Sequence, residues 1–304
     1  MHQPLVSITI TTKNEAKNIE NCLKSIKEQT YENIEIIVVD NKSEDNTEEI
    51  ARAYTYEVYD KGPERSAQRN YGMINKSKGE YVMFVDADMI FSPTLIESCV
   101  ELIEESDYLA LHIPEIVLGK KFFSRVRRFE RSFYNGTVID GARFFKKDAF
   151  AKVKGFDEAM SGPEDWDIDK KIEQIGKIGI IPNTKISQSR TRRWGLENLI
   201  KEKGGDSNIS GAVIYHNEAE FDLKKYLDKK GYYAKSFDNY IKKWGQNDPD
   251  IKKQLGFYYR FLGVFVENGK WTKLLVHPFL TLGMYYLRFS VGLKFIQRKK
   301  TLFL

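Results

Sequence analysis

The stretch Tyr81-Val-Met-Phe-Val-Asp86-Ala-Asp88 places two aspartates at the end of a short apolar run. Such a run, bounded by polar residues, is typical of a buried strand. The small Ala87 lets a ligand approach both carboxylates, and Mg²⁺ and Mn²⁺ prefer carboxylate oxygens that they share with phosphates. The stretch therefore predicts a strand whose carboxyl end binds a divalent cation. A strand-ending turn with an aspartate as helix cap is the alternative.

Two earlier apolar runs end in polar residues in the same way. Leu5–Ile10 leads into Thr11, and Ile34–Val39 leads into Asp40. Segments with helical spacing separate these runs, so the sequence predicts an α/β fold with a mostly parallel sheet. Ligands of such sheets bind at the carboxyl ends of the strands. We therefore expect Thr11, Asp40 and Asp86 to meet in one crevice. The expected helices follow Asn14-Glu15 and cover 47–53, 66–75 and 95–103, and a short strand is expected over Glu57–Tyr59.

The middle of the chain is less regular, and the last part has a helical pattern. Strands are expected to end at His112 and to lie over Ile139–Phe145, Ile178–Ile181 and Thr184–Ser189, with helices over Lys120–Phe133 and Trp166–Ile175 and a helical pattern from Phe221 onward.

The charge of the 304 residues is unevenly distributed. The net charge is +5, but residues 216–304 contain 17 basic and 8 acidic residues, a net of +9, which leaves a net of −4 for residues 1–215. The last 89 residues also contain 19 of the 40 aromatic residues. This distribution excludes a uniformly basic nucleic-acid binder. It predicts two parts, an acidic body over 1–215 and a basic, aromatic, helical region over 216–304.

The cysteines and the apolar runs bear on the compartment. Cys22 and Cys99 cannot form a disulfide framework, and no metal-binding cysteine pattern is present, so we expect buried thiols in a reducing compartment. The first residues lack a signal-peptide pattern.

The apolar run Leu274–Leu287 is about 14 residues long, short of the roughly 20 that cross a bilayer. We expect an amphipathic helix on the membrane surface. Packing as a helical subdomain or as a dimer contact is the alternative.

Three further groups of residues carry chemistry. Glu164 and Asp165 follow a Gly-Pro turn and open a helix, where a carboxylate serves as a general base or only as a cap. Arginines suit phosphate oxygens, although a solvated basic loop is equally compatible with the sequence. His216 can ligate a metal beside carboxylates, or it is an ordinary histidine. The arginines concerned are Arg190, Arg192 and Arg193, with Arg65 and Arg69 as weaker candidates.

Taken in this order, the motifs resemble those of the family 2 inverting glycosyltransferases, which have the GT-A fold. The resemblance covers about residues 4–218 and implies a catalytic GT-A domain over 1–215. The segments that carry it are Val6–Glu15, Ile36–Thr47, Gly62–Gly72, Asp86–Asp88, Lys154–Asp165 and His216.

The resemblance implies an activity and a set of site residues. A sugar would move from a nucleotide sugar to a hydroxyl of a glycan or lipid-linked acceptor, with inversion. A UDP-sugar is the preferred donor, and a GDP-sugar stays open. Asp165 is the implied catalytic base. The implied ligands of Mn²⁺ or Mg²⁺ are Asp86, Asp88 and His216. The implied nucleotide-sugar-binding residues are Thr11, Thr12, Glu15, Asp40, Arg69, Asp86, Arg192 and Arg193.

The sequence also departs from the family pattern. Lys42 and Lys154 stand where the family has glycine, and Thr11 stands where it usually has proline. Ile90 disfavours the dolichol-phosphate sugar synthases, and Arg190 disfavours the processive synthases. A nucleotidyltransferase and a membrane-tethered nucleotide-sugar-binding module stay open as alternatives. The expected location is cytoplasmic and peripheral on the cell membrane, without nucleic-acid partners and with the oligomeric state open.

Overall fold

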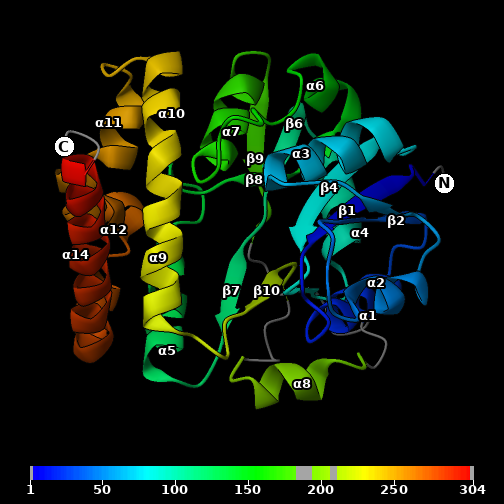
Figure 1. Ribbon diagram of the computed structural model, residues 1–304, viewed down its shortest axis with the longest axis horizontal. Coiled ribbons are helices and arrows are strands. Elements are labelled where there is room, and N and C mark those ends of the chain that lie inside the picture. Colours follow the sequence, from blue (N-terminus) through cyan, green and yellow to red (C-terminus); the bar gives the residue numbers. More distant parts are fainter. Residues whose placement is uncertain (1–2, 183–193, 206–210, 302–304) are drawn as a thin grey trace.

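The computed structural model describes residues 3–182, 194–205 and 211–301, and its centre is a seven-stranded sheet (Figure 1). The strand order is β3-β2-β1-β4-β8-β6-β9. The first four of these strands run parallel, whereas β8 runs antiparallel to both β4 and β6. The expected mostly parallel α/β sheet is confirmed, and the strand expected over 184–189 lies outside the described residues. The strands are β1 (Val6–Thr12), β2 (Ile34–Asp40), β3 (Val58–Asp60), β4 (Tyr81–Asp86), β6 (Tyr108–His112), β8 (Ala142–Lys146) and β9 (Lys177–Ile180).

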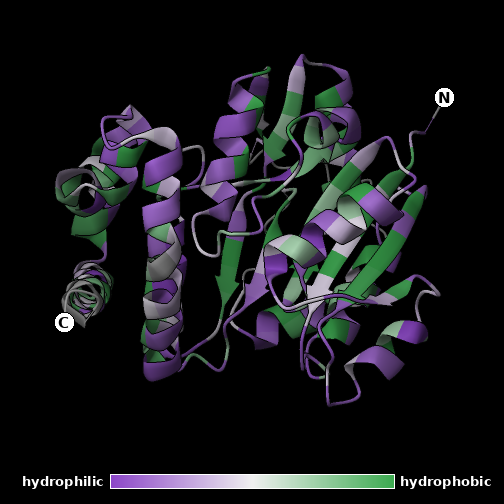
Figure 2. Ribbon diagram, turned by 45° about the horizontal axis from the view of Figure 1, so that its top comes forward, coloured by the Kyte–Doolittle hydropathy of each residue, from purple (hydrophilic) through white to green (hydrophobic). Residues whose placement is uncertain are grey.

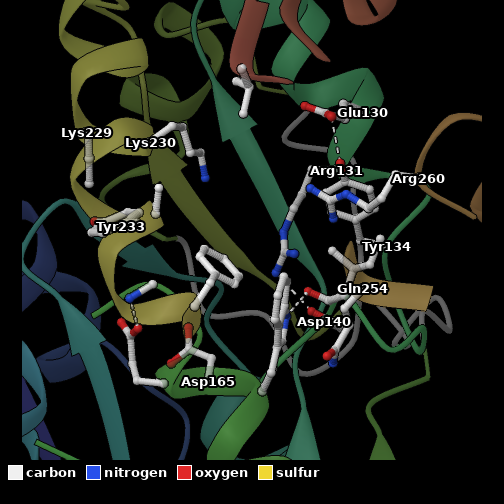
Figure 3. A pocket seen from close by; sticks show the side chains of 18 of the residues that line it. Glu130, Arg131, Tyr134, Asp140, Asp165, Lys229, Lys230, Tyr233, Gln254 and Arg260 are labelled. Carbon is white, nitrogen blue, oxygen red and sulfur yellow. Dashed lines mark hydrogen bonds and ion pairs between the residues drawn. The ribbon is translucent and has the colours of Figure 1, made fainter. Parts of the chain in front are cut away.

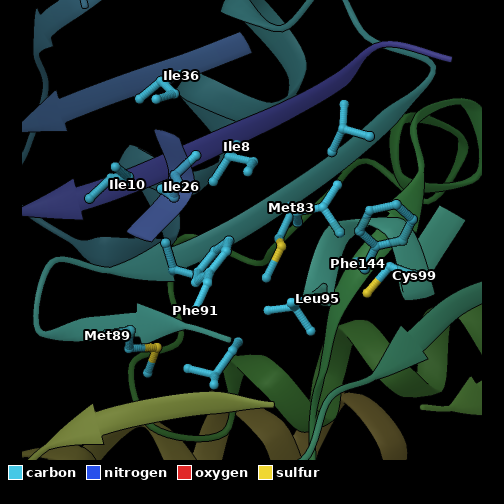
Figure 4. Close-up of a cluster of buried hydrophobic side chains, with 14 of the residues drawn as sticks. Ile8, Ile10, Ile26, Ile36, Met83, Met89, Phe91, Leu95, Cys99 and Phe144 are labelled. Atoms are coloured by element: carbon cyan, nitrogen blue, oxygen red, sulfur yellow. The ribbon is translucent and has the colours of Figure 1, made fainter. Parts of the chain in front are cut away.

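Both faces of this sheet are buried, which explains the continuous apolar runs in its strands. Along β4, Met83 belongs to the apolar cluster on one face and Phe84 to the cluster on the other. The free thiols Cys22 and Cys99 are buried in the first cluster, as expected. Figure 4 shows Cys99 among the apolar side chains of this cluster. Full burial of one aliphatic or phenylalanine side chain of these clusters contributes about 1.5–3 kcal/mol to stability. The first face packs against α1 (Ile19–Lys27), α2 (Thr47–Arg52) and α4 (Leu95–Glu104), the second against η1 (Tyr71–Lys76), α6 (Lys147–Lys152) and α7 (Glu164–Glu173), and α3 (Arg65–Asn70) leads into η1.

A second, three-stranded sheet lies beside the first and has the order β5-β10-β7. It consists of β5 (Met89–Phe91), β7 (Glu115–Leu118) and β10 (Ile214–Asn217). The central strand β10 pairs antiparallel with β5 and parallel with β7. The short helix α8 (Glu197–Glu202) packs on this sheet through Ile200. The sequence did not predict these strands, and they bring His216 next to the aspartate pair.

The C-terminal helices form a layer beside the sheets. In Figure 1, α9 and α10 stand between the strands and α14. Helix α5 (Phe122–Arg131) joins this layer, since Val126 and Phe129 pack with Met284 and Leu287 of α14. Among the described residues no helix is both long and apolar enough to span a bilayer. The helices of this layer are α9 (Leu223–Tyr233), α10 (Phe237–Trp244), α11 (Pro249–Leu255), α12 (Val264–Val266), α13 (Thr272–Val276) and α14 (Pro278–Thr301), with the turns η3 (Ala234–Ser236), η4 (Tyr259–Gly263) and η5 (Glu267–Gly269).

The hydropathy of the elements follows this arrangement. Figure 2 shows apolar residues concentrated in the strands of the seven-stranded sheet, while the helices around them alternate between polar and apolar colours. The alternation is the pattern of helices that cover a core with one face and meet solvent with the other.

Candidate active site

The carboxyl ends of β1, β2 and β4 bring four predicted residues side by side. In the parallel register Thr12 pairs with Asp40, and Thr11 pairs with Asp86. The Thr11 hydroxyl donates to Oδ1 of Asp86 over 3.2 Å. The expected convergence of polar side chains at this sheet edge is therefore present.

Asp40 is the last residue of β2, and Glu15 follows β1 in the chain. The carboxylate of Asp40 accepts hydrogen bonds from the backbone N–H of Ser43 (2.7 Å) and from its hydroxyl (2.6 Å). These bonds hold the turn after β2. Burial raises the pKa of Glu15, and the negative charges of Asp88 and Asp86 add to that rise. Glu15 therefore lies within the electrostatic reach of the aspartate pair.

Arg69 lies at the centre of the site and is 1% exposed. Its Nη1 donates to Oδ1 of Asp165 over 2.9 Å, and its Nη2 donates to Oδ1 of Asp86 over 3.3 Å. The guanidinium carbon lies 4.0 Å from the ring centroid of Phe84, a cation–π contact that helps to hold a desolvated cation. Arg69 thus joins the end of β4 to the start of α7.

Asp86 is held in its ionised form by neighbouring arginines. Burial alone would raise the pKa of its carboxyl, but Arg69, Arg65 and Arg143 hold that pKa well below its usual range. Arg65 also donates to Glu164 over 3.0 Å. A permanently charged carboxylate at this position suits a cation or a ribose hydroxyl as its ligand.

Glu164 and Asp165 have different environments although they are neighbours. Glu164 is 2% exposed, and burial together with the charge of Asp165 raises its pKa. The side chain of Asp165 is 32% exposed and lines a cavity. A Cβ on Gly141 would lie 2.8 Å from Cβ of Asp165, so a glycine is needed there for the close approach of the two segments. Both carboxylates line the cavity, and Asp165 is the more accessible of the two to a substrate.

His216 connects Asp88 to a carboxylate that the sequence did not indicate. Its Nε2 lies 3.2 Å from Oδ2 of Asp88, and its Nδ1 lies 3.0 Å from Oε1 of Glu115. Burial opposes a charge on the ring, yet Asp88 and Glu115 raise the pKa of His216 well above its usual range. A carboxylate on the second ring nitrogen is the common arrangement that orients a metal-binding histidine.

The donor set was tested for its fit to a divalent cation. Within the described part of the chain, no cluster of three or more His, Cys, Asp and Glu side chains is arranged around one point. Oδ1 of Asp88, however, is buried and has no hydrogen-bond partner. Mg²⁺-type ions are commonly held by one or two protein carboxylates plus substrate phosphates. Asp88 and His216 therefore fit a cation whose remaining ligands come from a diphosphate.

A cavity of about 910 Å³ extends from this site toward the C-terminal helices. Its lining includes Asp86, Asp165 and His216 as well as Lys230 and Arg260. Figure 3 shows Asp165 away from Lys230 and Arg260. The arginines Arg190, Arg192 and Arg193 were predicted to bind phosphate and lie outside the described residues. Trp194, which follows them, stacks on Tyr215 with a centroid separation of 5.9 Å.

Some residues of the site had no signal in the sequence. Glu115 accepts from Arg131 over 3.3 Å and from Arg143 over 3.2 Å in addition to contacting His216. No motif contains it, since β7 meets β10 only through a pairing about 100 residues apart in the chain. The one sequence feature that marks Glu115 is its place as a polar residue at the start of an otherwise apolar run.

Comparisons with known proteins agree with this architecture. The sequence model of the family described as Glycosyl transferase family 2 matches residues 7–154. An uncharacterized glycosyltransferase of Rickettsia typhi is 37% identical over 220 residues, which are 65% of this chain and 69% of that protein. The glycosyltransferase GlyG of Streptococcus pneumoniae is 30% identical over 147 residues, which are 46% of this chain and only 43% of GlyG.

Solved structures show the same fold at low sequence identity. The mannosyltransferase PcManGT of Pyrobaculum calidifontis, in complex with GDP-Man and Mn²⁺, has a TM-score of 0.60 at 19% identity, covering 98% of this chain and 89% of that one. A fragment of S. aureus TarS in complex with UDP-GlcNAc has a TM-score of 0.52 at 17% identity, covering 94% and 81%. The expected GT-A fold is confirmed.

Proposed function

The chain belongs to glycosyltransferase family 2, and from that premise we propose a metal-dependent, inverting transfer of a sugar from a nucleotide sugar to an acceptor hydroxyl. A UDP-sugar is the first candidate donor and a GDP-sugar the second. The observation that carries the proposal is the position of Arg69, hydrogen-bonded to Asp86 on one side and to Asp165 on the other. This position supports a mechanism in which Arg69 keeps Asp86, beside the donor, at a fixed distance from Asp165, the base beside the acceptor.

The donor is proposed to lie along the strand ends. Thr11, Thr12, Glu15 and Asp40 would contact the base and ribose, and Asp86 the ribose or the metal. Asp88 and His216 would hold Mn²⁺ or Mg²⁺, which supplies positive charge against the diphosphate when bound. The partnerless Oδ1 of Asp88 supports this assignment.

The transfer step is proposed to use Asp165 as general base. Its carboxylate accepts the proton of the acceptor hydroxyl while the hydroxyl oxygen forms a bond to the anomeric carbon. The bond from that carbon to the diphosphate oxygen breaks, and its electron pair stays on the leaving nucleoside diphosphate. Attack from the face opposite the leaving group inverts the configuration. The 32% exposure of the Asp165 side chain supports this role, whereas the Glu164 side chain is 2% exposed.

Donor binding and donor hydrolysis test the proposal. The full chain is titrated with UDP-GlcNAc, UDP-glucose and GDP-mannose, with Mn²⁺ or with EDTA, and the free sugar released by water is measured. We expect Mn²⁺-dependent binding of one donor and slow hydrolysis. Binding without hydrolysis or transfer would favour the nucleotide-sugar-binding module instead, and no binding of any donor would overturn the proposal.

We further propose that residues 1–215 form the catalytic part and residues 216–304 a part that rests on an anionic bilayer. Of the 17 large apolar side chains that are exposed in the described part of the chain, 13 lie in the segment from Leu255 to Leu293. Five of them occupy one face of α14 at helical spacing, beside a region with a net charge of +9. Exposed aromatics with basic neighbours are the composition of interfacial helices. The five are Phe279, Leu282, Tyr286, Phe289 and Leu293.

Vesicle flotation of the full chain tests the membrane contact. We expect co-flotation with vesicles that contain anionic lipid at low salt and weaker co-flotation with neutral vesicles. Replacement of Phe279 and Phe289 by serine should reduce it. If the chain stays in the bottom fraction at low salt, away from the vesicles, and forms a dimer in solution, this face contacts another copy of the protein instead.

A further inference from the structure

The part of the cavity farthest from the sheet has basic walls. Lys230 projects into it from α9, and Arg260 projects from η4 on the other side, whereas Asp165 lies away from both (Figure 3). Arg127 of α5 lines the same space. The cavity is continuous from Asp165 to these cations, so one ligand can contact both.

The basic residues of this region differ in how they are neutralised. Arg127 is paired with Glu130 at 3.0 Å and with Glu218 at 3.3 Å. Arg288 also pairs with Glu130 at 3.0 Å. Within the described residues, by contrast, no carboxylate lies within 4.0 Å of the charged nitrogens of Lys230 or Arg260. Among the described residues, these two cations therefore have no counter-ion.

Both unpaired side chains also have incomplete hydrogen bonding within the described residues. Nη1 of Arg260 is buried and has no hydrogen-bond partner. The ammonium of Lys230 lies 5.6 Å from the ring centroid of Tyr226 and 5.9 Å from that of Tyr233. A buried guanidinium nitrogen without a partner carries a desolvation cost that nothing offsets. An anion placed between the two side chains would remove that cost.

The electrostatics of Lys230 agree with a missing anion. Burial lowers the pKa of its ammonium to about 7, and the charges of Arg127, Lys229 and Arg260 add to that effect, while Glu130 alone opposes it. A bound anion would reverse the balance and favour the charged form. Binding of an anion near neutral pH should therefore be accompanied by uptake of a proton.

We propose that Lys230 and Arg260 bind a phosphate or diphosphate group of the acceptor, which lies in the cavity with its hydroxyl at Asp165. This inference rests on the proposed function and specifies its acceptor as an anionic one. The donor diphosphate has its own candidate ligands in Asp88 and His216, of which His216 lines this cavity and Asp88 does not. Phe257 lines the cavity and is also 66% exposed, so an apolar chain attached to the phosphate could leave toward the exposed face of the helical layer.

Calorimetric titration with inorganic pyrophosphate tests the subsite without knowledge of the acceptor. EDTA is present throughout, so that metal-dependent binding at Asp88 does not contribute. The variants are Lys230→Met, Arg260→Met and their combination, with Lys224→Met as the control because Lys224 is an exposed lysine of the same helix. Lys230→Arg keeps the charge and serves as the conservative variant, and thermal melts confirm that each protein is folded.

The expected result is a loss of pyrophosphate affinity by about tenfold in each single variant and more in the double variant. Lys230→Arg should retain most of the pyrophosphate affinity. Lys224→Met and Asp88→Asn should bind pyrophosphate as the unmodified chain does. In buffers of different ionisation enthalpy, the unmodified chain should take up a proton at pH 8 and Lys230→Met should not. Unchanged affinity in the double variant, or loss of affinity in Asp88→Asn alone, would overturn the proposal.

Geranyl diphosphate distinguishes the two sources of such a phosphate. If it binds more tightly than pyrophosphate and loses that advantage in Phe257→Ser, the group belongs to a lipid-linked acceptor. Equal affinities identify a soluble sugar phosphate or phosphate-bearing glycan. Donor titration on the same samples separates this inference from the proposed function, because loss of the phosphate subsite leaves donor binding in place, whereas failure of donor binding in the unmodified chain refutes the function itself.

Discussion

Nη1 of Arg69 and Oδ1 of Asp165 are 2.9 Å apart, and because Nη2 of Arg69 also donates to Asp86, Arg69 ties the end of β4 to the start of α7. The pair is partly screened from solvent, since the Arg69 side chain is 2% exposed and that of Asp165 is 32% exposed. A salt bridge in such a position fixes the direction of the carboxylate. It also makes the fold depend on the arginine, because removal of one partner leaves the other charge uncompensated.

Arg69→Met should therefore destabilise the fold. The substitution leaves Asp86 without its nearest cation, and we expect the free energy of unfolding to fall by about 3–5 kcal/mol. Arg69→Lys keeps the charge but not the planar guanidinium with its several donors, so it should destabilise the protein less than Arg69→Met. Urea unfolding of the three proteins measures the effect, and a loss below about 1 kcal/mol would mean that the pair does not hold the site together.

Gly141→Ala should impair turnover through Asp165. The new Cβ would lie 2.8 Å from Cβ of Asp165, so α7 or the loop before β8 must shift. A displacement of about 1 Å at a reacting group costs on the order of 100-fold in rate. Donor hydrolysis should fall accordingly, while the donor Kd changes little. Equal loss of donor affinity and rate would show that the loop positions the donor rather than the base.

Glu115→Gln should weaken metal binding without touching the metal. Glu115 contacts Nδ1 of His216, and substitution of such an orienting carboxylate typically costs 10–100-fold in affinity. Mn²⁺ affinity is measured by electron paramagnetic resonance with UDP present. Glu173→Gln, at the exposed end of α7, is the matched control. An unchanged Mn²⁺ affinity would mean that His216 is not a ligand.

The His112–Asp169 pair predicts a stability that depends on pH. Nε2 of His112 lies 2.7 Å from Oδ2 of Asp169. Burial opposes protonation, but Asp169 and Asp140 raise the pKa of His112 from 6.5 to about 9 against the charge of Arg131. The folded state thus binds the proton more tightly. The stabilisation is complete below pH 6.5 and is lost as the pH rises through about 9.

The test is a comparison with His112→Gln, because other groups also titrate in this range. The difference in the free energy of unfolding between the two proteins should shrink by up to about 3 kcal/mol between pH 6 and pH 9.5. A difference that stays constant over this interval would show that His112 is neutral in the folded protein.

The central sheet could be predicted from the sequence because burial on both faces leaves a clear local pattern. Each of the runs before Thr11, Asp40 and Asp86 is a strand of the sheet, and their polar ends meet as expected. The backbone also follows the family pattern where the side chain does not. Lys42 and Lys154 stand where the family has glycine, yet both adopt the left-handed conformation, with φ of 51° and 62°.

The three-stranded sheet could not be predicted, for a physical reason. Its strands are three or four residues long, and its pairings join β10 to partners about 100 residues away or more. Such contacts leave no local periodicity. Glu115 was missed for that reason. The bond from Arg69 to Asp165 was missed as well, since the sequence indicated a phosphate contact for Arg69 and could not show which carboxylates would surround it.

The measurement that tests the central claim most directly compares Asp165→Asn with the unmodified chain in donor binding and donor hydrolysis. The amide keeps the shape and can still accept a hydrogen bond from Arg69, but it cannot take a proton. We expect a folded protein, a donor Kd within about twofold of the original, and a rate lowered by a factor of roughly 100 to 10,000. Hydrolysis at a near-normal rate in Asp165→Asn would contradict the assignment of Asp165 as the catalytic base.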